Sequence, residues 1–158
     1  MTWTGGCQCG AVRFRIDGEL GTPSICHCRM CQKATGGFFG PYVPAQIADV
    51  TWTRGARKRF QSSNKVWRGF CGDCGTPLTF ENQPGVIDLA IGVFDDPAPL
   101  KPDVQLGSPD RLPWVDELPA LPSREQDEPR TAAYLSDLVS YQHPDHETEA
   151  WTPRISST

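Results

Sequence analysis

The fold is decided by two short stretches, which read CQCG at residues 7–10 and CGDCG at residues 71–75. In an extended segment, side chains two residues apart point to the same face, so Cys7 and Cys9 can reach one ion together. Cys71 and Cys74 span a tight turn, and Gly75 after them can adopt a left-handed conformation. Four thiolates in a tetrahedral array form a closed structural zinc site. The two pairs together therefore predict such a site, which would tie the start of the chain to its middle.

A third cluster reads CHCRMC at residues 26–31 and supplies three sulfurs, from Cys26, Cys28 and Cys31, on one short loop. Three protein ligands and one open position are the pattern of a catalytic zinc, where the open position takes water or an incoming thiol. Three alternatives stay open. His27 could complete a second closed site, although in an extended segment it points away from its cysteine neighbours. The triplet could be a redox group without metal, or the three clusters could pair differently.

The composition explains why such a site is needed. The 158 residues predict one domain, and Leu, Ile, Val and Phe together make up only about one fifth of them, beside 15 Gly and 15 Pro. Zinc binding supplies folding free energy on the order of 10 kcal/mol in small zinc peptides. We therefore expect the four-cysteine site to replace missing apolar burial.

Other features narrow the class of protein. The opening residues 1–6 do not read as a signal peptide, and the absence of an apolar run of about 20 residues predicts no membrane span. We expect a cytoplasmic protein, where thiols stay reduced and clustered cysteines bind metal or do chemistry. The net charge of −4 argues against a nucleic-acid partner, which usually meets a basic surface. The sequence does not indicate the oligomeric state.

Alternating apolar residues and frequent turn signals predict a mainly β domain. The predicted strands cover residues 11–17, 38–43, 47–53, 66–70 and 86–94, the second broken near Pro41 and Pro44. In the first strand, Phe14 and Ile16 are expected to face the core, and Arg13 alternates with them.

The second half of the chain has a different texture. Seven prolines between residues 97 and 122 predict an irregular segment. Residues 123–158 are polar and charged, with a possible helix over residues 131–142 that places Leu135, Leu138 and Val139 near one face. We expect this helix to pack on the domain; a disordered tail or a dimer contact is the alternative.

Two cations flank the triplet. Arg29 and Lys33 lie beside Cys28 and Cys31 in the sequence. Either could pair with a carboxylate of a substrate, and the alternative for each is a solvated surface charge.

The motifs together resemble a known family. The matching stretches read GCQCGAVRF at residues 6–14, CHCRMCQKATG at 26–36, GFCGDCGTPL at 69–78 and RLPWVDELP at 111–119. They are similar to the glutathione-dependent formaldehyde-activating enzymes, a family that includes the centromere protein V relatives. The resemblance covers residues 3–122 as one zinc-binding domain, and leaves residues 123–158 as an extension.

The resemblance implies a mainly β, Mss4-like fold with two zinc ions. It implies that Cys7, Cys9, Cys71 and Cys74 hold a structural zinc and that Cys26, Cys28 and Cys31 hold a second zinc linked to activity. The implied activity is a carbon–sulfur lyase reaction run in reverse, which condenses formaldehyde with glutathione.

The predicted partners are a small thiol and a small aldehyde, and His27 is a candidate general acid. A non-catalytic zinc module and a thiol or redox sensor are the alternative functions.

Overall fold

The computed structural model describes residues 1–123 and 129–153. Its strands are β1 (Thr2–Gly6), β2 (Arg13–Asp17), β3 (Ser24–Cys26), β4 (Gly40–Gln46), β5 (Val50–Arg54), β6 (Lys58–Ser63), β7 (Val66–Phe70), β8 (Pro77–Glu81), β9 (Val86–Ala90) and β10 (Val104–Leu106). Its helices are α1 (Arg29–Thr35) and α2 (Pro129–Leu135), and its 3-10 turns are η1 (Ile47–Asp49), η2 (Ile91–Val93), η3 (Ser108–Asp110) and η4 (Val115–Ala120). The predicted mainly β class is confirmed.

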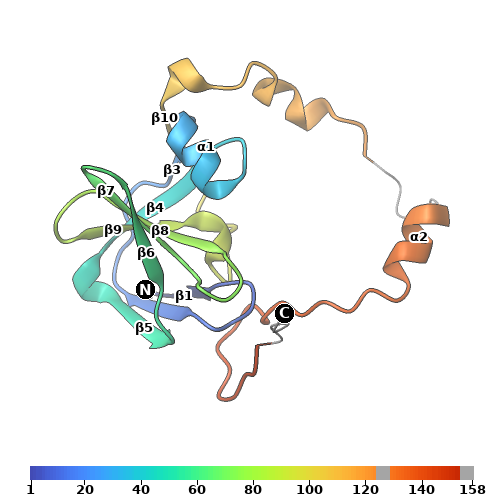
Figure 1. Cartoon of the computed structure of the whole chain (residues 1–158), viewed down its shortest axis with the longest axis horizontal. Coiled ribbons are helices and arrows are strands. Elements are labelled where there is room, and N and C mark those ends of the chain that lie inside the picture. The colour runs from blue at the N-terminus through green and yellow to red at the C-terminus, as the bar shows by residue number, and fades with distance from the viewer. Residues whose placement is uncertain (124–128, 154–158) are drawn as a thin grey trace.

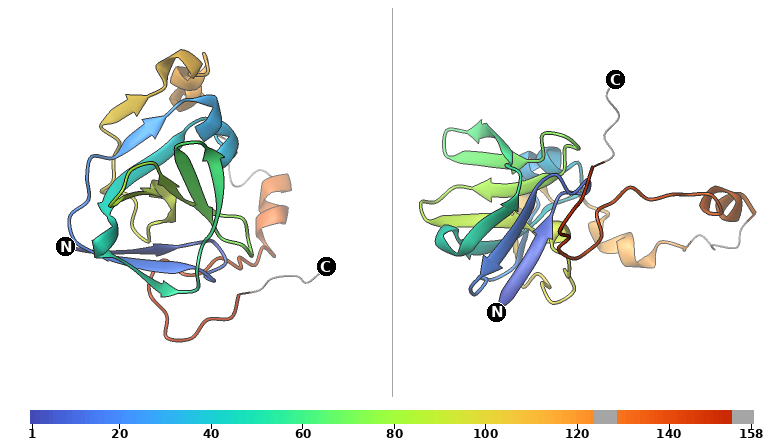
Figure 2. Two further views of the ribbon diagram at one scale, coloured as in Figure 1. Left: turned by 60° about the vertical axis from the view of Figure 1, so that its left-hand side comes forward. Right: turned by 90° about the horizontal axis from the view of Figure 1, so that it is seen from below.

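The strands form two sheets (Figures 1 and 2). The smaller sheet is antiparallel and has the order β1-β2-β5. The larger sheet has the order β10-β3-β4-β9-β8-β7-β6, and only its β10–β3 pair is parallel within the described residues. This order places β3, which ends at Cys26, between β10 and β4.

The main core lies between the two sheets. Phe14 and Ile16 of β2 are fully buried against Val43 of β4 and Leu89 of β9. Phe14 also meets the Phe94 ring edge to face, at 5.3 Å between centroids. The alternation expected for the first strand therefore holds for its apolar residues.

Arg13 departs from that alternation, because its side chain is only 2% exposed. Its guanidinium pairs with Asp95 at 2.5 Å and with Glu147 at 2.9 Å. The expectation that Arg13 faces solvent is therefore wrong. Two carboxylates, 82 and 134 residues away in the chain, provide the counter-charge that a buried cation needs.

Several strand boundaries also differ from the prediction. β4 runs through both Pro41 and Pro44, which sequence reasoning took as breaks. The strand predicted over residues 47–53 begins with a 3-10 turn, and the one over residues 86–94 ends in another. The predicted pattern omitted β1, β3, β6, β8 and β10. Of these, β3 and β10 are three residues long and β6 is largely exposed, so neither periodicity nor burial marks them.

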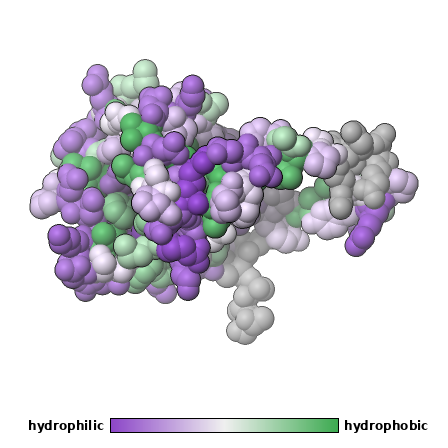
Figure 3. Space-filling model, turned by 90° about the horizontal axis from the view of Figure 1, so that it is seen from above, coloured by the Kyte–Doolittle hydropathy of each residue, from purple (hydrophilic) through white to green (hydrophobic). Residues whose placement is uncertain are grey.

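The C-terminal helix is shorter than predicted. Helix α2 ends at Leu135, and the chain from residue 139 to residue 142 is irregular. The apolar side chains of the predicted helix do not pack on the domain: Leu135, Leu138 and Val139 are 42%, 54% and 66% exposed. Figures 1 and 3 show this segment projecting from the sheets as an arm. An apolar spacing alone could not tell a covered helix face from an exposed one.

The described residues contain no helix with the length and apolar character needed to cross a membrane.

Candidate functional site

The structure gathers four cysteines from two distant turns. The sulfurs of Cys7, Cys9, Cys71 and Cys74 all lie within 4.8 Å of one another. The Cys7 and Cys9 sulfurs are 3.5 Å apart, and those of Cys9 and Cys71 are 3.9 Å apart. A tetrahedral zinc with Zn–S bonds of about 2.3 Å holds its sulfurs about 3.8 Å apart. The donor chemistry and spacing of this cluster therefore fit a zinc ion.

The two turns share a backbone design. In each, the first cysteine donates its N–H to a carbonyl five residues on, Cys7 to Val12 at 2.9 Å and Cys71 to Thr76 at 2.9 Å. Gly10 and Gly75 close the turns in the left-handed region, with φ of 74° and 78°. The left-handed conformation of Gly75 was expected. The extended path expected between Cys7 and Cys9 is wrong, because a turn brings their sulfurs together instead.

Electrostatics differ within this cluster. Burial raises the pKa of Cys7 and of Cys9. Burial also acts to raise the pKa of Cys74, but hydrogen bonds from Thr76 and from Cys9 outweigh it and bring that pKa to about 6. Backbone N–H groups of Val12 and Asp73 donate to the sulfurs of Cys7 and Cys71 at 3.2 and 3.4 Å. Such donors stabilise thiolates, which are the form that binds metal.

The second cluster lies where strand β3 passes into helix α1. Cys26 ends β3, Cys28 is the N-cap of α1, and Cys31 sits in the first turn of the helix. Their sulfurs also lie within 4.8 Å of one another. The expected short loop is thus a strand end joined to a helix start. All seven cysteines are described, and each is free of a disulfide.

A buried glutamine, whose role the sequence did not indicate, holds the junction between β3 and α1. Gln32 is 3% exposed, and its amide donates to the carbonyls of His27 at 2.6 Å and of Asp110 at 3.0 Å. Gly107 packs on the other side, where an added Cβ would meet the backbone nitrogen of Cys28 at 2.7 Å. The segment that follows β10 therefore supports the triplet. This role is visible in its tertiary contacts and not in its local sequence.

His27 lies outside the sulfur cluster. Its ring is fully buried, its Nε2 lies 3.2 Å from Oε1 of Gln105, and it meets the Phe39 ring edge to face. Among residues 1–123 and 129–153, those that gather around a possible ion there are the three cysteines. The position agrees with the expectation that His27 points away from its neighbours, so it does not complete a second closed site.

Arg68 is the charged residue of this site that sequence reasoning did not single out. It belongs to β7 and is 3% exposed. Its Nη2 donates to Sγ of Cys31 at 3.4 Å, and its Nη1 donates to the hydroxyl of Tyr42 at 3.0 Å. The only signal in the sequence was an arginine in an apolar strand pattern.

Thiol acidity varies across the triplet. Burial raises the pKa of Cys31 to about 12, although the hydrogen bond from Arg68 acts to lower it. For Cys28 the balance is reversed: burial acts to raise its pKa, but hydrogen bonds from the Cys31 N–H and from Cys26 lower it overall. Cys28 is partly exposed. The triplet thus combines one buried thiol with an accessible, more acidic one.

The two flanking cations are both exposed on α1. The guanidinium of Arg29 donates to the side-chain oxygen of Gln32, and the backbone N–H of Arg29 donates to Asp110 at 3.3 Å. Lys33 lies in the last turn of the helix. Their pairing with a substrate carboxylate stays a prediction.

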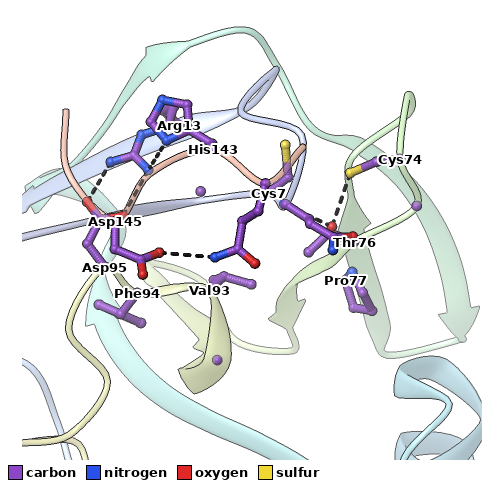
Figure 4. A pocket seen from close by; sticks show the side chains of 15 residues that line it. Cys7, Arg13, Cys74, Thr76, Pro77, Val93, Phe94, Asp95, His143 and Asp145 are labelled. Carbon is purple, nitrogen blue, oxygen red and sulfur yellow. Dashed lines mark hydrogen bonds and ion pairs between the residues drawn. The ribbon is translucent and has the colours of Figure 1, made fainter. Parts of the chain in front are cut away.

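A C-terminal strap, defined here as residues 143–151, packs against the four-cysteine site. The backbone N–H of His143 donates to the Gln8 carbonyl at 2.8 Å, and Nε1 of Trp151 donates to the Cys9 carbonyl at 2.7 Å. Figure 4 shows His143 beside Arg13 at the pocket that Cys7 and Cys74 also line. The sequence carried no signal for this contact, which joins residues more than 130 positions apart.

Comparison with known proteins shows the family of this chain. The family model described as "Glutathione-dependent formaldehyde-activating enzyme" matches residues 2–107, which include all seven cysteines. The chain belongs to this family. A Halomonas elongata protein, named as a candidate glutathione-dependent formaldehyde-activating enzyme, is 30% identical over 138 residues, which cover 80% of this chain and 85% of that protein.

A crystal structure of a Rhodobacter sphaeroides protein has the same fold. Its TM-score is 0.52 at 22% identity, and the match covers 65% of this chain and 98% of that one.

Proposed function

We propose that this member of the family is a zinc-dependent enzyme that adds a glutathione-like thiol to a small aldehyde at the three-cysteine site. The single observation that carries the proposal is the difference between the clusters: four sulfurs gather at one site and three at the other. In this proposal Cys7, Cys9, Cys71 and Cys74 hold a structural zinc, and Cys26, Cys28 and Cys31 hold the zinc of the active site.

The residues around the triplet suit thiol chemistry. A zinc bound there would lower the pKa of a bound thiol and so supply thiolate near neutral pH. Two side chains of the protein hold the cysteines in place: Gln32 donates to the backbone at the junction of β3 and α1, and Arg68 donates to the sulfur of Cys31. In the reaction, the thiol sulfur bonds to the carbonyl carbon, and the proton lost by sulfur ends on the former carbonyl oxygen. Holding both reactants together accounts for much of the expected rate gain.

The test measures the exchange between free formaldehyde, glutathione and their adduct by NMR. The zinc-loaded protein should accelerate exchange above the uncatalysed background, and metal analysis should return two zinc ions per chain. Exchange at the background rate across a panel of thiols and aldehydes would sink the lyase proposal and favour a non-catalytic zinc module.

A matched pair of variants locates the activity. Cys28→Ser should lose one zinc and the catalysed exchange while the fold survives. Leu138→Ala, an exposed change in the C-terminal arm, should leave both unchanged. Catalysis that survives in Cys28→Ser would place the reaction elsewhere. Reversible loss of the second zinc on mild oxidation, without any catalysis by the reduced protein, would favour the thiol sensor.

A further inference from the structure

Several groups hold the guanidinium of Arg68 in place. Beyond Cys31 and Tyr42, its Nε donates to Oγ of Ser62 at 3.1 Å, and the group stacks over the Phe80 ring at 4.9 Å. A side chain fixed by three hydrogen bonds and a ring loses nearly all of its freedom. Ordering a long side chain costs conformational entropy, which these contacts offset.

In the part of the chain that the structure describes, the charge of Arg68 has no carboxylate partner. The other fully buried arginine, Arg13, has both Asp95 and Glu147 within 2.9 Å. Among the described residues, the ion pairs found include none with Arg68. An isolated buried cation is strongly unfavourable. The group that Arg68 does contact is Sγ of Cys31, so the sulfur cluster would balance this charge once metal binding removes the protons from its thiols.

The four-cysteine cluster has no equivalent. Its sulfurs accept from the backbone N–H groups of Val12 and Asp73, and Cys74 contacts the hydroxyl of Thr76. Within the described part of the chain, no charged side chain has a hydrogen bond to a sulfur of that cluster. A cation at the sulfurs therefore distinguishes the three-cysteine site from the closed one.

Arg68 also borders open space. Together with Tyr42 and Phe70 it lines a cavity of about 220 Å³. Arg68 thus contacts the sulfur cluster and also lines this cavity.

We propose that Arg68 is a positioning residue of the three-cysteine site, which holds Cys31 and cancels one negative charge there, so that the site accepts an anionic fourth ligand, a thiolate. The inference rests on the proposed function. Three thiolates and one zinc ion leave one net negative charge, and a fourth thiolate raises it to two. The Arg68 cation brings the net charge back to −1, which reduces the repulsion that the incoming fourth thiolate would meet.

The experiment loads the protein with Co²⁺ in place of zinc and follows the sulfur-to-cobalt absorption bands. Chelator competition gives the affinity of each site, and titration with 2-mercaptoethanol gives the affinity of the three-cysteine site for a small thiol. Arg68→Met should weaken metal binding at that site by about 10–100-fold, the usual effect of removing an outer-shell partner. It should weaken thiol binding by at least about 10-fold and leave the four-cysteine site unchanged.

Conservative variants separate charge from packing. Arg68→Lys keeps the charge and should recover part of the thiol affinity. Arg59→Met, an exposed arginine on the neighbouring strand β6 that pairs with Glu81, is the matched control and should behave as wild type. Wild-type thiol affinity in a folded Arg68→Met would overturn the proposal.

Milder variants cover the case in which Arg68→Met does not fold. Ser62→Ala and Tyr42→Phe each remove one hydrogen bond to Arg68 and keep its charge. Each should broaden or shift the cobalt bands of the three-cysteine site and lower thiol affinity by a few-fold; spectra and affinities identical to wild type would overturn the proposal. A wild type that binds one metal per chain would instead overturn the proposed function, so the two failures are distinguishable.

Discussion

The two cysteine clusters use the same ligand atom in opposite ways. The four-cysteine cluster joins two glycine-closed turns; backbone N–H groups donate to its sulfurs, and the C-terminal strap donates to the carbonyl of Cys9. The three-cysteine cluster sits on a strand end and a helix start, with one buried cation at its sulfurs. The first cluster offers four sulfurs, which are enough to fill the coordination of a structural ion. The second cluster offers three sulfurs and a neighbouring positive charge, which suits a site that must accept a further ligand.

The clusters also differ in what depends on them. Cys7, Cys9 and Cys71 of the four-cysteine cluster pack with Val12 and Leu78 in the buried interior, and Cys74 is exposed at its edge. Cys26 and Cys28, by contrast, are partly exposed. Stability should therefore depend mostly on the first cluster, and reactivity mostly on the second.

The largest expected effect tests that division directly. Cys71→Ser removes a fully buried ligand and should abolish cooperative folding. Structural zinc supplies on the order of 10 kcal/mol in small zinc peptides, which is comparable with the whole stability of a domain. Cys28→Ser should fold with a loss of less than about 3 kcal/mol. Thermal unfolding by circular dichroism measures both; equal losses would contradict the division.

A pair of glycine substitutions compares the two turns of the closed site. Gly75→Ala meets only backbone strain, about 1–2 kcal/mol for a left-handed residue, because an added Cβ there finds open space. Gly10→Ala has the same strain, and its Cβ would also fall 2.4 Å from the His143 ring. It should therefore cost about 1–3 kcal/mol more than Gly75→Ala. Denaturant unfolding of the two variants measures the difference, and equal costs would show that the strap is not packed on Gly10.

A smaller effect is expected from the strap alone. Trp151→Phe removes the hydrogen bond to the Cys9 carbonyl and should cost about 1 kcal/mol. It should also speed zinc loss from the four-cysteine site and leave the three-cysteine site unaffected. Leu138→Ala in the exposed arm is the control. Faster loss of metal from the three-cysteine site in Trp151→Phe would count against the assignment of the strap to the closed cluster.

The smallest effect is a pH dependence at His143. Burial, with the nearby charge of Arg13, lowers the pKa of His143 below its ordinary value. The unfolded chain then binds the proton more readily, near its ordinary pKa of about 6.5, so the stability contributed by neutral His143 is present above that pH and lost as pH falls.

Comparison with variants isolates this contribution from acid release of metal. The difference in melting temperature between wild type and His143→Asn should shrink between pH 8 and pH 5. The same difference for exposed His146→Asn serves as the control. A difference that stays constant across this range would remove His143 from the account.

Local spacing explains what could be predicted. The strands around Phe14 and Leu89, the glycine-closed turn at Gly75 and the three separate cysteine clusters all follow from residues close together in sequence. The failures involve distant partners. Arg13 looked like a surface residue because its carboxylates come from residues 95 and 147. Helix α2 looked like a packed helix because its apolar spacing does not reveal whether another element covers it.

The chemistry available to this protein can be read from its amino acids: seven thiols in three spaced clusters, in a chain with a small share of apolar residues. Ligand identity and spacing are local properties, so they can be read without a structure. Which charges and which carbonyls surround each cluster depends on the three-dimensional fold. Arg68 reaches Cys31 across 37 residues, and Trp151 reaches Cys9 across 142. Such contacts depend on how the sheets and the strap fold back on one another, and no local pattern encodes that path.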